Sequence, residues 1–275
     1  MSGACTGTEE SDRIGKASVA SPGFALGTAQ ERVMKISKAI IALAGTSVAV
    51  IAGATQGAVI FSGSSGSHSA TASFEVNGAG ALVVTLTNDA TADTLVPSDL
   101  FTAIFFDVSG GSLSLTRDSV VLAAGSSVEY GSQPAGGVVG GEWGYVGNLA
   151  GAPAGAQYGI SSTGINLFSS STVFPGGNLA GPADPDGPQY GLASAGDNPA
   201  TGNGGITGSG GLIKNSVVVT LGGAGTDFDL SRIGNVLFFY GTAVGEGQFE
   251  GHVPTPGAAA LVGIAGLTCM RRRQR

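Results

Sequence analysis

Proton-transfer and nucleophile chemistry has few candidate residues in this 275-residue chain. Histidine occurs only twice, as His68 and His252, and neither lies beside a G-x-S-x-G turn that would present a serine nucleophile. Cys5 and Cys269 lie near the two ends, so the body of the chain has neither a cysteine nucleophile nor a disulfide framework. A zinc site needs three or four nitrogen or sulfur ligands, which this composition does not supply. The body is therefore predicted not to be an enzyme of these classes.

An acid beside an aromatic ring is the remaining catalytic candidate. Glu142 precedes Trp143, and such a ring can desolvate a carboxyl group and stack on a sugar, as a glycoside hydrolase requires. The alternative is that Trp143 packs in the core while Glu142 is solvated or paired with a basic residue. We favour the alternative and expect a non-enzymatic protein.

Two further groups of residues could bind a ligand. Asp184 and Asp186 flank Pro185 in a turn that has the start of a calcium loop but lacks its further oxygen ligands. This pattern predicts a solvated turn, and weak, millimolar binding of calcium is the alternative. No other cofactor is expected. Four aromatic residues would form a stacking surface for an exopolysaccharide if they were exposed together; these are Trp143, Tyr145, Tyr158 and Tyr190.

The charge distribution excludes one class of partner. Between residues 55 and 252 the chain has fifteen acidic residues and only three basic ones, Arg117, Lys214 and Arg232. A nucleic-acid-binding protein needs a basic patch that displaces counterions from phosphates. Binding to nucleic acid is therefore not expected.

The elements that would position these residues are strands. The chain has 49 Gly and 11 Pro, and its 11% of charged residues is too few for the solvent faces of a helical bundle. Apolar residues alternate with polar ones in Thr71–Val76, Leu82–Thr87 and Val217–Leu221, as in half-buried strands. Ala103–Phe106 and Val236–Tyr240 are apolar on both faces and suit central strands. Residues 55–251 are predicted to form an all-β, antiparallel, jelly-roll-like sandwich.

Residues 136–211 are rich in glycine and proline and predict long loops. A short internal repeat lies within them: Asn148-Leu149-Ala150-Gly151 followed by Gln157-Tyr158-Gly159-Ile160 is echoed at Asn178–Gly181 and Gln189–Leu192. Two copies are too few for a solenoid. We expect two similar loop-and-strand excursions on one face of the sandwich.

The first of two predicted targeting signals begins at Met34. Two lysines precede an uncharged apolar run, and Ala52 and Ala54 supply the small-x-small pattern that signal peptidase accepts. Residues 34–54 are therefore predicted to be a helical signal peptide cleaved by that enzyme. Residues 1–33 are polar, and we expect either a disordered extension or translation that starts at Met34.

The second signal occupies residues 252–275. A proline motif precedes an apolar run, Ala258–Met270, and a terminal arginine cluster. Thirteen helical residues span only ~20 Å, so the run predicts a marginal transmembrane helix whose arginines stay cytoplasmic. The motif consists of Val253, Pro254, Thr255, Pro256 and Gly257, and the stop-transfer cluster of Arg271, Arg272, Arg273 and Arg275.

This ordered tail resembles the PEP-CTERM sorting signal of Gram-negative surface proteins. The resemblance covers about 23 residues, matches Pro254 and Pro256 to the two motif prolines, and departs from it at Thr255, where glutamate is usual. It implies recognition and processing by a membrane-embedded exosortase. The segments around Trp143, Ile160 and Leu212 also resemble exosortase-dependent surface domains of unknown activity.

The expected function is that of an exported protein, anchored in the membrane in transit and then placed at the cell surface or in the extracellular matrix. Signal peptidase and an exosortase are its predicted partners, together with the membrane through the C-terminal helix. A carbohydrate-binding or adhesive module is the first alternative, and a secreted hydrolase that uses an acid pair is the second.

Overall fold

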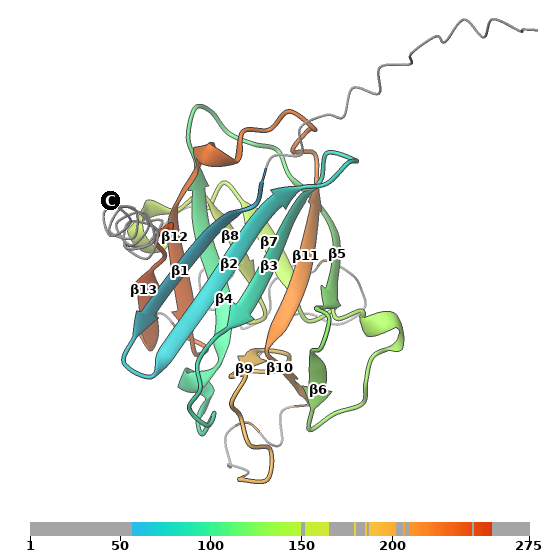
Figure 1. Ribbon diagram of the computed structural model, residues 1–275, viewed down its shortest axis with the longest axis vertical. Coiled ribbons are helices and arrows are strands. Elements are labelled where there is room, and N and C mark those ends of the chain that lie inside the picture. Colours follow the sequence, from blue (N-terminus) through green and yellow to red (C-terminus); the bar gives the residue numbers. More distant parts are fainter. Residues whose placement is uncertain are drawn as a thin grey trace, which may run out of the picture. The chain divides into compact units, whose positions relative to one another are not determined.

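A computed structural model shows how the body of the chain folds (Figure 1). The described residues all belong to one compact unit, 52–275, and are 57–149, 152–164, 179, 185, 187–201, 206, 210–243 and 245–254. The predicted signal peptide lies outside the described residues, as do residues 1–33 and the tail from residue 255. In the part that is described, no helix is long and apolar enough to cross a membrane.

One layer is a five-stranded antiparallel sheet, here sheet A. Its order is β1 (Val59–Ser65), β2 (His68–Val76), β3 (Leu82–Asn88), β11 (Ser216–Gly222) and β5 (Thr116–Leu122). The predicted half-buried strands are β2, β3 and β11, whose apolar positions are buried while Thr85 and Glu75 lie at more exposed positions. Asn77 turns the β2–β3 hairpin, since its side-chain oxygen accepts hydrogen bonds from the Ala79 and Ala81 amides at 3.0 Å.

The second layer, sheet B, splits into two branches at one edge of β4 (Phe101–Val108). Its main path is β13 (Gly247–Glu250), β12 (Ile233–Tyr240), β4, β9 (Leu192–Ala193), β10 (Leu212–Lys214) and β6 (Ser127–Glu129). A branch runs from β4 through β8 (Tyr158–Ser161) to β7 (Gly144–Gly147). All pairs are antiparallel except β9 with β10. Four short 3-10 turns complete the described elements: η1 (Pro97–Asp99), η2 (Ala135–Gly137), η3 (Pro153–Gly155) and η4 (Leu230–Arg232).

The internal repeat accounts for this division. Tyr158–Ser161 of the first copy pairs with Ala103–Phe106 of β4, and Leu192 of the second copy pairs with Phe101 of the same strand. Both copies therefore extend sheet B, one of the two layers, from the same edge of β4. Their apolar residues are the reason, because β4 offers a buried edge on which Ile160 and Leu192 lose all exposure to solvent.

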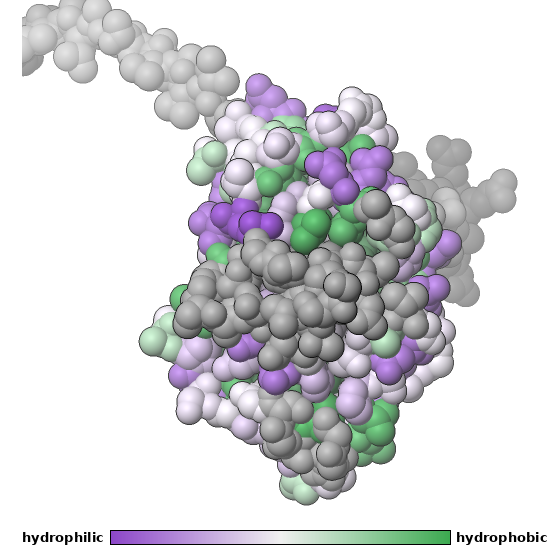
Figure 2. Space-filling view, turned by 180° about the vertical axis from the view of Figure 1, so that it is seen from behind, coloured by the Kyte–Doolittle hydropathy of each residue, from purple (hydrophilic) through white to green (hydrophobic). Residues whose placement is uncertain are grey.

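The main core lies between the sheets and is aromatic. Phe74 of sheet A meets Phe106 of sheet B edge to face at 5.4 Å between ring centroids, and Phe106 stacks on Tyr158 at 5.3 Å. A smaller cluster covers the outer face of sheet B, where Phe105 meets Phe239 at 5.2 Å under Leu149 and its neighbours. The prediction that β4 and β12 are covered on both faces is thereby confirmed. On the surface seen in Figure 2, apolar residues form separate patches among hydrophilic ones.

Candidate functional site

The C-terminal motif begins where sheet pairing ends. Ser62 in the middle of β1 and His252 exchange two backbone hydrogen bonds, each 2.9 Å long, in an isolated antiparallel bridge. Gly63 makes this approach possible, because a Cβ atom there would clash with the backbone oxygen of Glu250. This pairing joins sheet A to the β13 side of sheet B, and we call it the closed edge. Val253 and Pro254 follow directly and are exposed.

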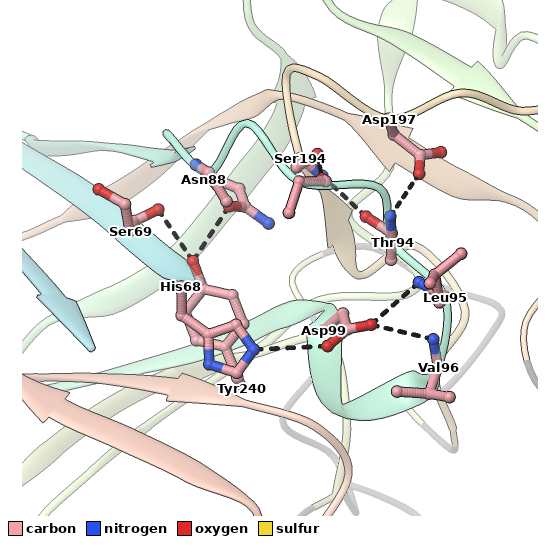
Figure 3. Close-up of polar contacts among 12 residues, drawn as sticks. His68, Ser69, Asn88, Thr94, Leu95, Val96, Asp99, Ser194, Asp197 and Tyr240 are labelled. Carbon is pink, nitrogen blue, oxygen red and sulfur yellow. Dashed lines mark hydrogen bonds and ion pairs between the residues drawn. The ribbon is translucent and has the colours of Figure 1, made fainter. Parts of the chain in front are cut away.

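A stacked ring pair lies near the closed edge (Figure 3). His68, the first residue of β2, stacks on Tyr240, the last residue of β12, with ring centroids 4.2 Å apart and planes 10° from parallel. Nε2 of His68 lies 3.5 Å from Oδ1 of Asp99, whose other oxygen accepts hydrogen bonds from the Leu95 and Val96 amides. The pair therefore links the two sheets and η1.

The Tyr240 hydroxyl adds polar links between the sheets. Its single proton lies between two acceptors, the backbone oxygen of Ser69 at 2.9 Å and Oδ1 of Asn88 at 3.0 Å (Figure 3). Asn88 in turn donates to the backbone oxygen of Leu192. Burial raises the pKa of Tyr240, so the hydroxyl stays protonated and remains a donor.

These groups do not form a hydrolytic triad. Within the described ranges, no serine or threonine hydroxyl bonds to His68, and the adjoining cavity has a volume of about 10 Å³, enough for about one water molecule. A Ser–His–Asp site needs a hydroxyl bonded to the histidine and room for a substrate. The arrangement of His68, Asp99 and Tyr240 is suited to holding the sheets together.

An acidic cluster lies at the opposite end of sheet B. Glu129 of β6 is 3.5 Å from the Lys214 ammonium group, which also donates to the backbone oxygen of Asp197 at 2.7 Å. Asp197 is buried and accepts a hydrogen bond from the Thr94 amide (Figure 3). Burial, together with the adjacent Asp197 side chain, raises the pKa of Glu129 above its ordinary value of 4.5, against the opposing effect of Lys214. No cluster of three metal-ligating side chains occurs among the residues the structure places.

The predicted aromatic stacking surface is not present. Trp143, Tyr145 and Tyr158 are buried, and Tyr190 is half-buried against the main core. The condition for that surface, joint exposure of the four rings, is not met, because Trp143, Tyr145 and Tyr158 belong to the main core and Tyr190 packs against it. Trp143 is a core residue, which agrees with the packing interpretation of the Glu142–Trp143 pair.

Several predicted site residues cannot be placed. Asp184, Asp186, Ala52 and Ala54 lie outside the described residues, and so do Thr255, Pro256, Gly257 and the terminal arginines. Sequence reasoning missed the closed edge, because its partners Ser62 and His252 are 190 positions apart. The available signal was Gly63, a glycine within an otherwise regular strand pattern, which indicates a close backbone approach.

Comparisons with known proteins identify no relative: no family model, no curated protein and no solved structure matches this chain.

Proposed function

We propose that this chain is an exported, non-enzymatic protein of the cell surface or extracellular matrix, sorted and processed at its C-terminal motif by an exosortase. The N-terminal signal would start translocation and be removed near Ala54. The apolar tail would hold the folded domain in the membrane until the motif is processed.

The observation that carries this proposal is the position of the closed edge. All thirteen strands that the structure describes lie between residues 59 and 250, and the Ser62–His252 bridge comes just before Pro254. Processing beyond His252 would therefore leave the sandwich with every one of these strand pairs. Val253 and Pro254 are exposed, as a segment that enters an enzyme's active site has to be.

The alternatives have less support in the described residues. An adhesive module that stacks sugars on Trp143 and Tyr158 would need exposed rings, and both are buried. A hydrolase would need two carboxylates that face each other across a cleft. Glu129 and Asp197 are adjacent, but Asp197 is buried and Glu129 is half-buried against it beside Lys214.

The proposal is tested by replacing Pro254 and Pro256 with Ala in the full chain expressed in a host with an exosortase. We expect the double variant to stay in the membrane fraction at its unprocessed mass, while the wild type is released at a lower mass. Intact mass spectrometry of both fractions gives the result.

A matched control replaces Pro97 and Pro134, two prolines of the folded domain, with Ala. This control should be processed like the wild type. If the Pro254/Pro256 variant releases the same mature mass as the wild type, the motif is not the processing signal and the proposal is wrong.

A further inference from the structure

The side of the sandwich away from the closed edge carries an open groove. It runs along Val108–Arg117, the loop that enters β5, and faces Tyr145–Leu149, which includes the outer strand β7. Two adjoining depressions of about 490 and 600 Å³ make up the groove, and Asn148 lines both. Each is in the size range of sites that bind small ligands. We call this side the open edge.

Hydrogen bonds made by Tyr158 and Arg232 fix the walls of the groove. The buried Tyr158 hydroxyl accepts a hydrogen bond from the Leu113 amide at 2.6 Å and lies 3.1 Å from the Leu113 backbone oxygen. On the other side of the loop, Arg232 donates to the backbone oxygens of Ser109 and Gly111 at 2.7 and 3.2 Å, and its guanidinium lies 5.3 Å from the centre of the Phe228 ring. The groove is thus preformed.

Arg117 gives the groove a positive charge, which is rare in this acidic domain. Its Nε donates to the backbone oxygen of Tyr145 at 3.1 Å, which bridges β5 and β7. Since no other described residue bonds to the guanidinium, its two terminal nitrogens are available to a ligand. No carboxylate pairs with Arg117 in the part of the chain that the structure describes. The carboxylate of nearby Asp107 is already bonded to the Gln157 amide and the Asn235 side chain.

The lining of the groove therefore contrasts with the rest of the domain. It has one arginine and no acidic residue, in a segment with fifteen acidic and three basic residues. The other groups that line it include the hydroxyls of Ser114 and Thr116 and the amide of Asn148. These are donors and acceptors suited to sugar hydroxyls, and a guanidinium binds a carboxylate with two parallel hydrogen bonds.

We propose that this groove binds an acidic saccharide, with a uronic-acid carboxylate on Arg117 and the sugar hydroxyls on Ser114, Thr116 and Asn148. A polymer suits it better than a compact ligand, since the two depressions continue along one line and neither is enclosed. This inference goes beyond the proposed function and does not depend on it, because binding can be measured on purified protein regardless of export.

The test is isothermal titration calorimetry of the full chain in detergent with a short oligogalacturonate at low salt. The same oligosaccharide with its carboxyl groups methyl-esterified serves as the matched neutral probe. We expect binding of the acid form, at least tenfold weaker binding of the ester, and weaker binding of the acid form in 0.5 M NaCl. Arg117→Gln should lower the affinity for the acid form about tenfold or more, and Arg117→Lys by less.

Two further variants separate the groove from general charge effects. Ser64→Asp lowers the net charge as Arg117→Gln does, but at an exposed position of β1, and should bind like the wild type. Ser114→Trp fills the groove without removing the arginine and should abolish binding. This variant still tests the proposal if Arg117→Gln has a lowered melting temperature. The proposal is overturned if acid and ester bind equally, if polyglutamate binds as tightly as the saccharide, if wild type shows no binding at millimolar probe, or if folded Ser114→Trp binds like the wild type.

Discussion

The closed and open edges of the sandwich are held together by different kinds of interaction. At the closed edge, backbone groups of Ser62 and His252 bond directly and the His68–Tyr240 stack lies close by. At the open edge, one exposed side chain, Arg117, bridges β5 to β7. Further along β5, the described residues also form backbone contacts: Val121 and Val138 make an isolated bridge, and the Val139 amide donates to the Val120 oxygen.

This difference between the two edges indicates that fold stability and ligand access depend on different parts of the sandwich. At the closed edge, the backbone hydrogen bonds and the stack of His68 on the buried Tyr240 ring fix the geometry, so this edge can tolerate processing of the adjacent tail. A side-chain bridge leaves space beside it, which is where the groove lies. We infer that stability of the fold depends mainly on the closed edge and that ligand binding depends on the open one.

The largest expected effect comes from removing the Tyr240 ring. Tyr240→Ala should lower the free energy of unfolding by about 3–5 kcal/mol, because it leaves a cavity under His68 and unpaired polar groups at Asn88. Tyr240→Phe keeps the ring and should cost about 1–3 kcal/mol. Urea denaturation of each variant measures both values.

Arg117→Ala is the corresponding variant at the open edge. It should lower the free energy of unfolding by only about 0.5–1.5 kcal/mol, the contribution of one hydrogen bond. If Arg117→Ala proves as destabilising as Tyr240→Ala, the two edges contribute equally and the distinction drawn between them is wrong.

Adding one methyl group at Gly63 is expected to have a smaller effect than removing the Tyr240 ring. A Cβ atom would clash with the backbone oxygen of Glu250 and approach the Phe249 ring to 2.9 Å, so Gly63→Ala should cost about 1–3 kcal/mol. The loss should be local: the Ser62 and His252 amides should exchange with deuterium faster, while those of β3 keep most of their protection.

Gly57→Ala is the matched control, since nothing lies within 4 Å of the Cβ that it adds. It should change the free energy of unfolding by less than about 0.5 kcal/mol. Unchanged exchange at Ser62 in Gly63→Ala would show that β1 does not depend on the contact with Glu250.

The sequence predicted the strands better than it predicted their neighbours. Alternation in β2 and β3 and the double-sided runs in β4 and β12 are local signals, so these strands could be found without knowing their partners. The closed edge depends on Ser62 meeting His252 across most of the chain, which no local pattern encodes. The buried position of Trp143 was favoured from the sequence, whereas that of Tyr158 could not be decided: its glycine-rich neighbours are typical of loops, and only the opposing sheet shows that this ring fills a core.

The smallest effect should be a dependence on pH at the far end of the open side, where β6 forms the edge of sheet B. Because burial raises the pKa of Glu129, the folded state holds its proton more tightly than the unfolded state does. Stability should therefore fall as pH rises from about 4.5, the ordinary pKa, through the raised value in the folded protein. Glu129→Gln cannot ionise and should remove this part of the decline.

Thermal melting between pH 4 and 7 measures the profile, with Glu75→Gln on the exposed face of β2 as the control that should follow the wild type. The Tyr240 hydroxyl should not contribute to the same decline, because burial raises its pKa and it stays protonated over this range. A Glu129→Gln profile that parallels the wild type would mean that the Lys214 ammonium offsets the burial of the carboxyl group. The contrast between the open side and the closed edge would then be limited to packing and ligand access.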